Sequence, residues 1–417
     1  MKRIVFCTVG SLGDVHPYVA IAKELIARGH QAVIATTDRH RHVVEREGIV
    51  YAPLRPGEAE FGSLEAVAET LFHPWRGPRY LIREMVMPFV RQQYEDIATA
   101  CKGADLLVTH PLTVTGPLVC EKTGLPWVSS ILAPISLLSA LDRPLVNSAL
   151  WAHALRNVGA PAYRLLKALG KSMARRWERP LDDLRSELGL EKKAQPALFE
   201  GQFSPRLNLA LFSRVLAQPK TDWPANTLVT GLPRFDGPPM DATLQGSLDS
   251  FMQDGAPPIA FALGSSVVMI AGDFWDKAIE ASTVLKRRAI LLTGTPLATS
   301  LPEGIIAFDY LPYSAVFPRA AALVHQAGIG TLTQAISAGR PQLIVPVAFD
   351  QPDNARRAAG LGIARTLPMQ KVTASRLIQE LTALLADPSY ATKASDAAAS
   401  REDGSSAAAD ALLRTLR

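Results

Sequence analysis

The sequence predicts an α/β protein with two domains, each built on a doubly wound parallel sheet. Short apolar runs, typical of buried parallel strands, alternate with segments of helical period along most of the chain. This alternation stops once, in a proline-rich stretch, and then starts again. The length of 417 residues also exceeds what one hydrophobic core usually supports, which favours two domains of similar size.

The first half opens as a strand–loop–helix–strand unit. Residues 2–8 predict a strand and residues 10–14 a loop of small residues, and a helix should begin near Pro17 and end at Gly29. Further strands of this half are expected over residues 31–36, 50–52, 105–109, 127–132 and 206–212.

The second half follows a stretch with seven prolines, which disfavour long helices. Its strands are expected over residues 259–263, 289–293, 305–308, 321–325 and 341–347. We therefore expect an N-terminal domain over 1–216, a proline-rich linker over 217–258 and a C-terminal domain over 259–390. A terminal helix over 391–417 should pack back on the N-terminal domain, since alanine is a strong helix former.

The composition argues against several classes of protein. The formal net charge of +5 comes from 44 basic and 39 acidic residues spread along the chain, which disfavours nucleic acid as a partner. The three cysteines lie far apart without metal-ligand spacing, so we expect buried thiols in a reducing compartment. No segment reads as a signal peptide or as a membrane span, and we expect a cytoplasmic protein.

The strongest local signal of chemistry follows the strand expected over residues 321–325. His325 ends this strand, Gly328 and Gly330 form a turn, and a helix opens at about Thr331. A helix N-terminus offers unpaired N–H groups and a partial positive charge to a phosphate, and glycine lets the backbone approach it closely. A histidine that ends a strand is by itself more often structural.

A second group of polar residues strengthens the interpretation as a binding site. Asp350, Gln351 and Asn354 follow the strand expected over residues 341–347. Open α/β sheets bind ligands at the carboxyl ends of their strands, and carboxylate and amide groups there suit sugar hydroxyls. The alternative is that Asp350 and Asn354 only cap the following helix.

These residues together resemble a known family. The segment from Tyr310-Leu311-Pro312 through His325 to Asp350-Gln351 resembles the C-terminal donor signature of family 1 glycosyltransferases. The loop from Gly10 to Pro17 is similar to the N-terminal loop of the sterol glucosyltransferase, bacterial rhamnosyltransferase and antibiotic glycosyltransferase branches. The resemblance implies the GT-B fold, in which two Rossmann-like domains face each other across a cleft, the first for the acceptor and the second for a nucleotide sugar.

The resemblance also implies a set of donor-binding residues. His325 would contact the pyrophosphate, and Asp350 and Gln351 would bind the hexose hydroxyls. The remaining positions of the predicted donor set are Gly13, Ser265, Tyr310, Leu311, Gly328, Ile329, Gly330 and Thr331. The co-substrate would be a UDP- or TDP-linked sugar, with no bound cofactor and no metal. Thr333 stands where plant members carry a ribose-binding glutamate, so the choice between UDP and TDP stays open.

The resemblance further implies inversion at the anomeric carbon, and an inverting transfer needs a base that takes the proton of the acceptor hydroxyl. The resemblance places Asp14 at that position, and His16 is the close alternative. In plant members of the family the base is a histidine, and an aspartate orients it. His110, after the strand expected over residues 105–109, falls roughly where those members keep the aspartate. A further arrangement is therefore a pair with exchanged roles, in which Asp14 is the base and His110 orients it. The structural alternatives are that Asp14 caps a helix and that His110 is an ordinary strand-end residue. Four other histidines have no partner that the sequence identifies and are expected at the surface: His30, His40, His42 and His153.

The acceptor should lie against loops of the N-terminal domain, at Phe72, Trp75, Met85, Phe89, Pro134 and Leu138. These apolar side chains favour a lipophilic small molecule or a lipid, with core packing as the alternative for each. The basic segment over residues 156–185 is either a solvated helix face or a peripheral contact with an anionic membrane. We expect a monomer or a weak dimer.

The sequence thus predicts an inverting hexosyltransferase that uses glucose or rhamnose. A non-catalytic partner protein of the same fold and a nucleotide-sugar epimerase are the alternatives. A dinucleotide-binding oxidoreductase is disfavoured, because the first loop lacks the G-x-G-x-x-G pattern.

Overall fold

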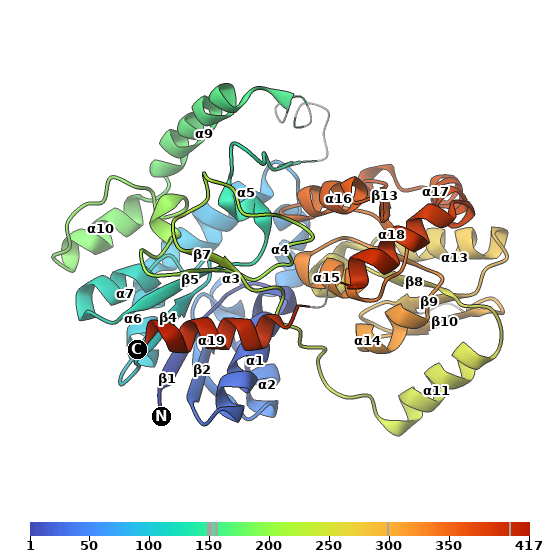
Figure 1. Ribbon diagram of the computed structural model, residues 1–417, viewed down its shortest axis with the longest axis horizontal. Helices are drawn as coiled ribbons and strands as arrows, with labels where there is room; N and C mark the ends of the chain where they lie inside the picture. Colours follow the sequence, from blue (N-terminus) through green and yellow to red (C-terminus); the bar gives the residue numbers. More distant parts are fainter. Residues whose placement is uncertain (148–151, 153, 155–156, 298–299, 400–401) are drawn as a thin grey trace. The chain divides into compact units, whose positions relative to one another are not determined.

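A computed structural model describes residues 1–147, 152, 154, 157–297, 300–399 and 402–417 (Figure 1). The contacts within the chain divide it into two compact units. Unit 1 comprises Met1–Pro144, Leu150–Phe235 and Glu402–Arg417, and unit 2 comprises Leu145–Ala149 and Asp236–Arg401.

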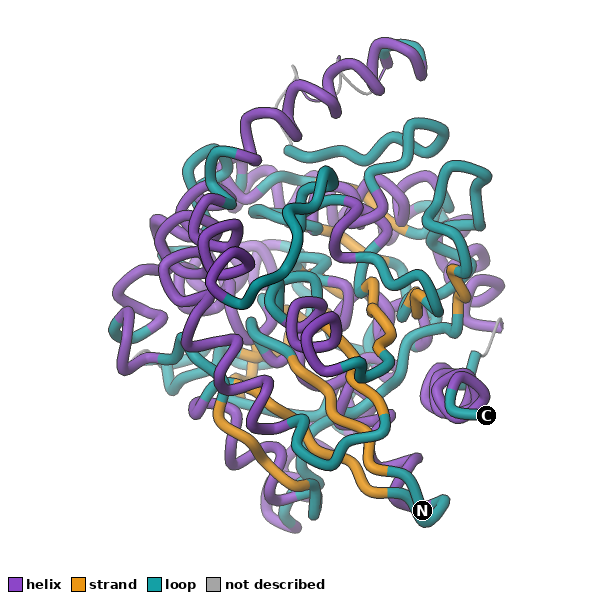
Figure 2. The backbone as a smooth tube through the Cα atoms, turned by 90° about the vertical axis from the view of Figure 1, so that its left-hand side faces the viewer, coloured by secondary structure: helices purple, strands orange, loops and turns teal. Residues whose placement is uncertain are grey.

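Unit 1 is built on a parallel sheet that has seven strands within the described residues, in the order β3-β2-β1-β4-β5-β6-β7. Its strands are β1 (Arg3–Cys7), β2 (Gln31–Thr36), β3 (Val50–Pro53), β4 (Leu106–Thr109), β5 (Trp127–Ile131), β6 (Asn208–Ala210) and β7 (Thr227–Val229). Its helices are α1 (Leu12–Ala27), α2 (Arg41–Arg46), α3 (Glu58–Phe61), α4 (Leu64–Leu71), α5 (Gly77–Tyr80), α6 (Val90–Ala100), α7 (Gly116–Thr123), α9 (Ala160–Arg175), α10 (Arg179–Glu187) and α19 (Gly404–Thr415). Figure 2 shows strands of this sheet side by side, with helices packed around them.

Unit 2 repeats the pattern with a parallel sheet of six described strands, in the order β10-β9-β8-β11-β12-β13. Its strands are β8 (Ile259–Ala262), β9 (Ala289–Leu292), β10 (Ile305–Phe308), β11 (Ala322–His325), β12 (Gln342–Ile344) and β13 (Ala364–Thr366). Its helices are α11 (Ala242–Gln253), α12 (Gly264–Val267), α13 (Phe274–Val284), α14 (Tyr313–Val316), α15 (Ile329–Ser337), α16 (Gln351–Gly360), α17 (Ala374–Ala386) and α18 (Pro388–Ala399).

The apolar runs of the sequence form the central strands because both faces of each sheet are covered. Val5 and Phe6 of β1 have no exposed surface, and neither do Ile290 and Leu291 of β9. Burial of one such side chain contributes about 2 kcal/mol. The predicted fold class, two doubly wound α/β domains, is confirmed.

The strand order fixes where each unit can bind a ligand. In both sheets the order reverses beside the first strand of the unit, between β1 and β4 in unit 1 and between β8 and β11 in unit 2. Open α/β sheets bind ligands at this switch point, outside the carboxyl ends of the strands. The loops that follow β1, β4, β8 and β11 are therefore the places to search for chemistry.

The segment expected to be a proline-rich linker without long helices, residues 217–258, contains β7 and α11, and the change of unit falls between Phe235 and Asp236. Its prolines stand outside β7 and α11, so they separate these elements without interrupting them. The sequence did not predict β7 or β13. Both have only three residues and lie at sheet edges, where the apolar pattern is weak.

The C-terminal segment forms two helices and not the single helix that was expected. α18 belongs to unit 2 and α19 to unit 1, and the side chain of Asp403 caps the start of α19 at the Ser406 N–H. α19 lies along α1 (Figure 1), where Arg28 donates a hydrogen bond of 2.7 Å to Ser406 and pairs with Asp410.

Candidate active site

Asp14 lies in the first turn of α1, directly after β1. The helix begins at Leu12 and not near Pro17, because Ser11 is its N-cap and Asp14 completes a capping box. The Asp14 Oδ2 atom accepts hydrogen bonds from the Ser11 N–H at 2.7 Å and the Ser11 hydroxyl at 3.0 Å. The expected capping role of Asp14 is thus present in the structure, and it occupies one of the two carboxylate oxygens.

His110 faces the other oxygen of the Asp14 carboxylate. Its Nε2 atom lies 3.3 Å from Asp14 Oδ1, and its Nδ1 atom accepts a hydrogen bond of 3.1 Å from the Leu112 N–H. A neutral ring with Nδ1 as acceptor carries its proton on Nε2, so the proton points at the carboxylate. The two side chains meet because β1 and β4 are neighbouring parallel strands that end at the same edge of the sheet. Their geometry is the one expected for the pair with exchanged roles, in which the histidine would orient the aspartate.

This pairing sets the charge of Asp14. Burial alone would raise the pKa of Asp14, but His110 and Ser11 together outweigh burial, and the pKa is lowered from its ordinary value of 3.8. The side chain of Asp14 is 31% exposed, whereas that of His110 is 5% exposed. Unit 1 therefore presents an ionised, partly accessible carboxylate that is held by a buried histidine.

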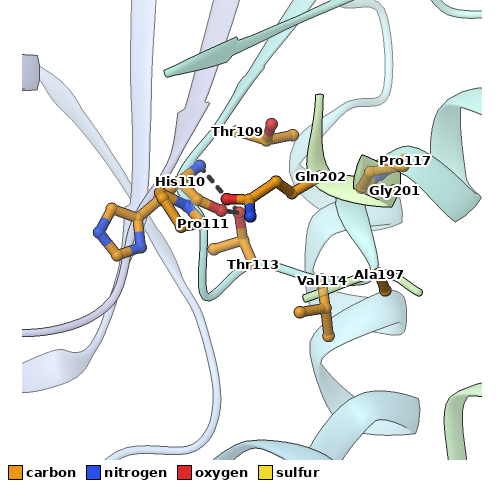
Figure 3. A pocket seen from close by; sticks show the side chains of 9 residues that line it. All are labelled: Thr109, His110, Pro111, Thr113, Val114, Pro117, Ala197, Gly201 and Gln202. Atoms are coloured by element: carbon orange, nitrogen blue, oxygen red, sulfur yellow. Dashed lines mark hydrogen bonds between the residues drawn. The ribbon is translucent and has the colours of Figure 1, made fainter. Parts of the chain in front are cut away.

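The backbone of His110 is fixed by a turn beside a small hollow. The His110 N–H donates to the Thr113 hydroxyl at 3.0 Å, and that hydroxyl donates to the His110 carbonyl at 2.7 Å. Figure 3 shows both bonds, with the imidazole extending away from the other residues that line the hollow. The hollow lies between the end of β4 and the segment around Gln202.

His16 and Gly13 take other positions in the same turn of α1. The ring of His16 meets the ring of Phe235 edge-on at 5.0 Å, and burial lowers the pKa of His16 to about 4, which makes it a weak base. The Gly13 N–H donates to the Ser11 hydroxyl at 3.2 Å as part of the helix cap. Contacts of His16 with an acceptor and of Gly13 with a donor stay predictions.

His40 is buried, which corrects the expectation that it lies at the surface. It is 3% exposed, and its Nε2 atom lies 2.9 Å from the Gly10 carbonyl oxygen. The 3-10 turn Asp38–His40 follows β2, the neighbour of β1, so the two loops meet at the same sheet edge. His30 also has a partner, since its Nδ1 atom accepts from the Lys2 N–H. His153 lies outside the described residues.

In unit 2, His325 is enclosed at the end of β11. It has no exposed surface, its Nδ1 atom accepts from the Ala327 N–H at 3.1 Å, and its Nε2 atom lies 3.0 Å from Gln342 Oε1. Burial lowers the pKa of His325 to about 4 and outweighs the opposite effect of the hydrogen bond that its Nε2–H donates to Gln342 Oε1. The predicted contact of His325 with a pyrophosphate therefore requires one ring nitrogen to give up its bond to Gln342 or Ala327 and to bind the phosphate instead. A neutral ring would give the phosphate a hydrogen bond but no positive charge.

The loop after β11 leads into the N-terminus of α15, where Asp350 is bound. Asp350 Oδ2 accepts from the Ile329 N–H at 3.1 Å and from the Asn354 amide at 2.7 Å, and that amide also donates to the Ala327 carbonyl at 2.9 Å. The helix leaves the N–H groups of Gly330 and Thr331 without intrahelical partners. Helix N-termini of this kind can bind anions, and here the Asp350 carboxylate accepts from the Ile329 N–H of the first turn.

A second loop of unit 2 closes on this site from β8. Gly264 has a φ of +68°, and a Cβ atom there would lie 2.2 Å from the Gln326 amide nitrogen, so only glycine allows this approach. Ser265, next to it, is exposed. Sequence analysis did not single out Gln326. Its Oε1 atom and Asn354 Oδ1 are buried without a hydrogen-bond partner among the described residues.

The other predicted donor residues have mixed environments. The Tyr310 side chain is 44% exposed and donates to the Asp236 carbonyl at 2.7 Å, whereas the Leu311 side chain is packed in the core and offers a nucleobase only its backbone. The Gln351 Oε1 atom accepts from the Val347 N–H at 2.9 Å, and the Thr333 hydroxyl donates to the Ile329 carbonyl at 3.0 Å. Thr333 is thus committed to its own helix.

The residues predicted to bind an acceptor differ in their exposure, and their contact with an acceptor stays a prediction. Phe72, Met85 and Pro134 are buried, Phe89 and Leu138 are half-buried, and Trp75 is 61% exposed. Pro134 and Leu138 follow β5, the neighbour of β4, and therefore lie at the sheet edge that carries His110. For Phe72 and Met85 the burial is that of core side chains, which was the alternative interpretation.

The basic segment over residues 156–185 forms α9 and α10 where it is described. Lys167 and Lys171 pair with Glu200, while Leu165, Leu169 and Met173 of α9 are exposed. In the described part of the chain, no helix is long and apolar enough to cross a membrane. The described residues contain no cluster of three or more histidine, cysteine, aspartate or glutamate side chains that could hold a metal ion.

Comparisons with known proteins give the family. Residues 4–109 match the glycosyltransferase family 28 N-terminal domain, and residues 289–408 match the erythromycin biosynthesis protein CIII-like C-terminal domain. The chain is 33% identical over 411 residues to O-mycaminosyltylonolide 6-deoxyallosyltransferase of Streptomyces fradiae, covering 94% of this chain and 92% of that protein.

Solved structures show the same fold. The glycotransferase of kitacinnamycin superposes with a TM-score of 0.71 at 21% identity, covering 100% of this chain and 99% of that one. The glycosyltransferase VinC in complex with DTDP has a TM-score of 0.69 at 21% identity, with the same coverage. The chain is therefore a hexosyltransferase that belongs to family 1 of the GT-B glycosyltransferases.

Proposed function

We propose that this enzyme transfers a hexose from a nucleoside diphosphate sugar to a hydroxyl of a lipophilic natural product, with inversion at the anomeric carbon. The observation that carries the proposal is the ionised Asp14 carboxylate held by His110 at the switch point of unit 1. A carboxylate in this position suits a base for an acceptor hydroxyl. We assign Asp14 as the catalytic base and His110 as the residue that positions it.

The proton and the electron pair move in one displacement. The acceptor oxygen forms a bond to the anomeric carbon while the bond from that carbon to the diphosphate oxygen breaks, and the electron pair leaves with the diphosphate. The hydroxyl becomes acidic as its oxygen forms the new bond, so a carboxylate of low pKa is basic enough to take the proton. The amides of Gly330 and Thr331 and the dipole of α15 would stabilise the charge on the leaving group.

TDP is the donor nucleotide that we favour over UDP. VinC was solved with DTDP, and the Streptomyces fradiae relative is named for transfer of a 6-deoxyallosyl group. Thr333 replaces the glutamate that binds ribose in the plant branch, and its hydroxyl bonds its own helix. Of glucose and rhamnose, rhamnose is therefore the better candidate, because it is a 6-deoxyhexose.

The acceptor that we propose is a lipophilic natural-product alcohol. The name of the Streptomyces fradiae relative specifies O-mycaminosyltylonolide as its acceptor. The half-buried Leu138, near the edge that carries Asp14 and His110, suits an apolar aglycone. A location in the cytoplasm and a monomeric or weakly dimeric state are proposed with it.

Calorimetric titration tests the donor site. We expect TDP to bind the wild-type protein and NADH not to bind. Asp350→Ala should bind TDP as the wild type does but bind TDP-glucose about tenfold more weakly, because a hydrogen bond to a charged group is lost at the hexose. Asp276→Ala, an exposed aspartate of α13, is the matched control and should bind both ligands normally.

The outcomes separate the proposal from its alternatives. Binding of NADH without TDP would restore the oxidoreductase. Binding of TDP-glucose with no transfer to any alcohol would favour a non-catalytic partner protein, and a change of the sugar within the donor would identify an epimerase.

Replacing His110 by leucine is expected to move the acid limb of the pH profile of kcat/KM to higher pH. His110 is the largest of the groups that lower the pKa of Asp14, so its removal raises that pKa. As the solution is made more acidic, Asp14 of the variant is therefore protonated at a higher pH than Asp14 of the wild type. Activity is lost at that higher pH. Profiles of both proteins from about pH 4 to 8 test this. Coincident limbs would show that His110 does not act through Asp14.

A further inference from the structure

His40 and Asp14 are joined through a single peptide group. His40 Nε2 lies 2.9 Å from the Gly10 carbonyl oxygen, and the N–H of the same peptide, which belongs to Ser11, donates to Asp14 Oδ2 at 2.7 Å. A carbonyl oxygen can only accept, so His40 is the donor, with its proton on Nε2. Because the peptide group is planar, the orientation of the Gly10 carbonyl fixes the orientation of the Ser11 N–H.

The backbone at Gly10 makes this orientation important. Gly10 has a φ of +133°, which residues with a side chain rarely adopt. A Cβ atom at this position would lie 2.4 Å from Asp14 Oδ2, so the carboxylate is packed against the Gly10 backbone. A rotation of the Gly10–Ser11 peptide would therefore withdraw the N–H that holds the carboxylate and disturb its packing.

We propose that His40 is a positioning residue for the transfer reaction, which fixes the Gly10–Ser11 peptide so that the Ser11 N–H holds Asp14 in place. This inference rests on the proposed role of Asp14 as the base. His110 acts on Asp14 Oδ1 from the end of β4, and His40 acts on the Oδ2 side from the end of β2. Two buried histidines from the strands on either side of β1 thus define the position of one carboxylate. Hydrogen bonds in a chain also polarise one another, so the bond from His40 to the Gly10 carbonyl polarises the peptide group whose N–H donates to Asp14.

A pair of variants separates the hydrogen bond of His40 from its bulk. Gln places an amide N–H close to the position of the imidazole Nε2, and Met has a similar length but no donor. With TDP-rhamnose and O-mycaminosyltylonolide, we expect His40→Met to lower kcat about tenfold with the donor KM unchanged, the loss of about one net hydrogen bond. His40→Gln should stay within about threefold of the wild type. His42→Ala, an exposed histidine two residues further on, is the matched control and should behave as the wild type.

A double-variant cycle tests whether His40 acts through Asp14. In the Asp14→Asn background, His40→Met should cause no further loss of kcat, because the base on which His40 acts has been removed. Equal losses in the Gln and Met variants, a wild-type kcat in His40→Met, or multiplied losses in the double variant would overturn the inference. If His40→Met does not fold, His40→Asn, whose amide is too short to reach Gly10, takes its place. A wild-type rate in Asp14→Asn alone would instead contradict the proposed base.

Discussion

Replacing Asp14 by asparagine is expected to lower kcat by about a thousandfold, which is within the usual contribution of a general base. Asparagine has the size of aspartate and can still accept hydrogen bonds from Ser11, so the capping box and the fold should be retained. It cannot take a proton from the acceptor. The dissociation constant of TDP, whose proposed site lies in unit 2, should be unchanged.

The control for this variant is Asp38→Asn. Asp38 is exposed just after β2, where an oxidoreductase would carry its ribose-binding acid. We expect its replacement to leave kcat and the affinity for TDP as they are. A large loss in Asp38→Asn and none in Asp14→Asn would reverse the assignment of the two carboxylates.

Replacing Asp353 by alanine is expected to lower the free energy of unfolding by about 3 kcal/mol. Asp353 in α16 has no exposed surface and lies three residues beyond Asp350. Its Oδ1 atom accepts from the Leu145 N–H and from Arg356, both near 2.9 Å, and its Oδ2 atom accepts from Arg357 at 2.7 Å. Removal of the carboxylate takes a negative charge from two arginines, one of them almost fully buried, and leaves the Leu145 N–H without its acceptor.

Urea unfolding of the purified protein measures this change, and Asp273→Ala is the matched control. Asp273 and Lys277 form an ion pair at the same i,i+4 spacing, but the Asp273 side chain is 70% exposed. Exposed pairs contribute little, so the control should lose less than about 1 kcal/mol. Similar losses in the two variants would show that the buried network around Asp353 does not stabilise unit 2.

Much of the fold could be predicted from the sequence because the central strands are nearly continuous apolar runs. β2 and β10 have the predicted bounds, and the other predicted strands differ by one to three residues at an end. The parallel arrangement places Asp14, His110 and Asp350 after carboxyl ends of strands and His325 at such an end, where open α/β sheets bind ligands. Position at a strand end together with the family resemblance therefore identified them as candidates. The short edge strands β7 and β13 carried too little of this signal.

The partners of the buried histidines could not be predicted in the same way. His40 lies 30 residues from Gly10, and the contact exists because β1 and β2 are adjacent, a pairing that single-sequence patterns indicate only weakly. Its place just after a strand was the signal that could have identified it. The partners of His325 were not predicted either: Gln342 at the start of β12 and the Ala327 N–H bind its two ring nitrogens, and its contact with a phosphate stays a prediction. Such contacts depend on register between neighbouring strands, which the periodicity of the sequence does not specify.

The most direct test of the central claim, that Asp14 serves as the base in an inverting displacement, is the rate and configuration of the glycoside formed from TDP-α-D-glucose or TDP-rhamnose. Wild-type protein and Asp14→Asn would be compared with O-mycaminosyltylonolide as acceptor, and the anomeric configuration read by NMR. We predict that the wild type gives only the inverted glycoside and that the variant forms it about a thousandfold more slowly. A glycoside with retained configuration, or an undiminished rate in Asp14→Asn, would contradict the account.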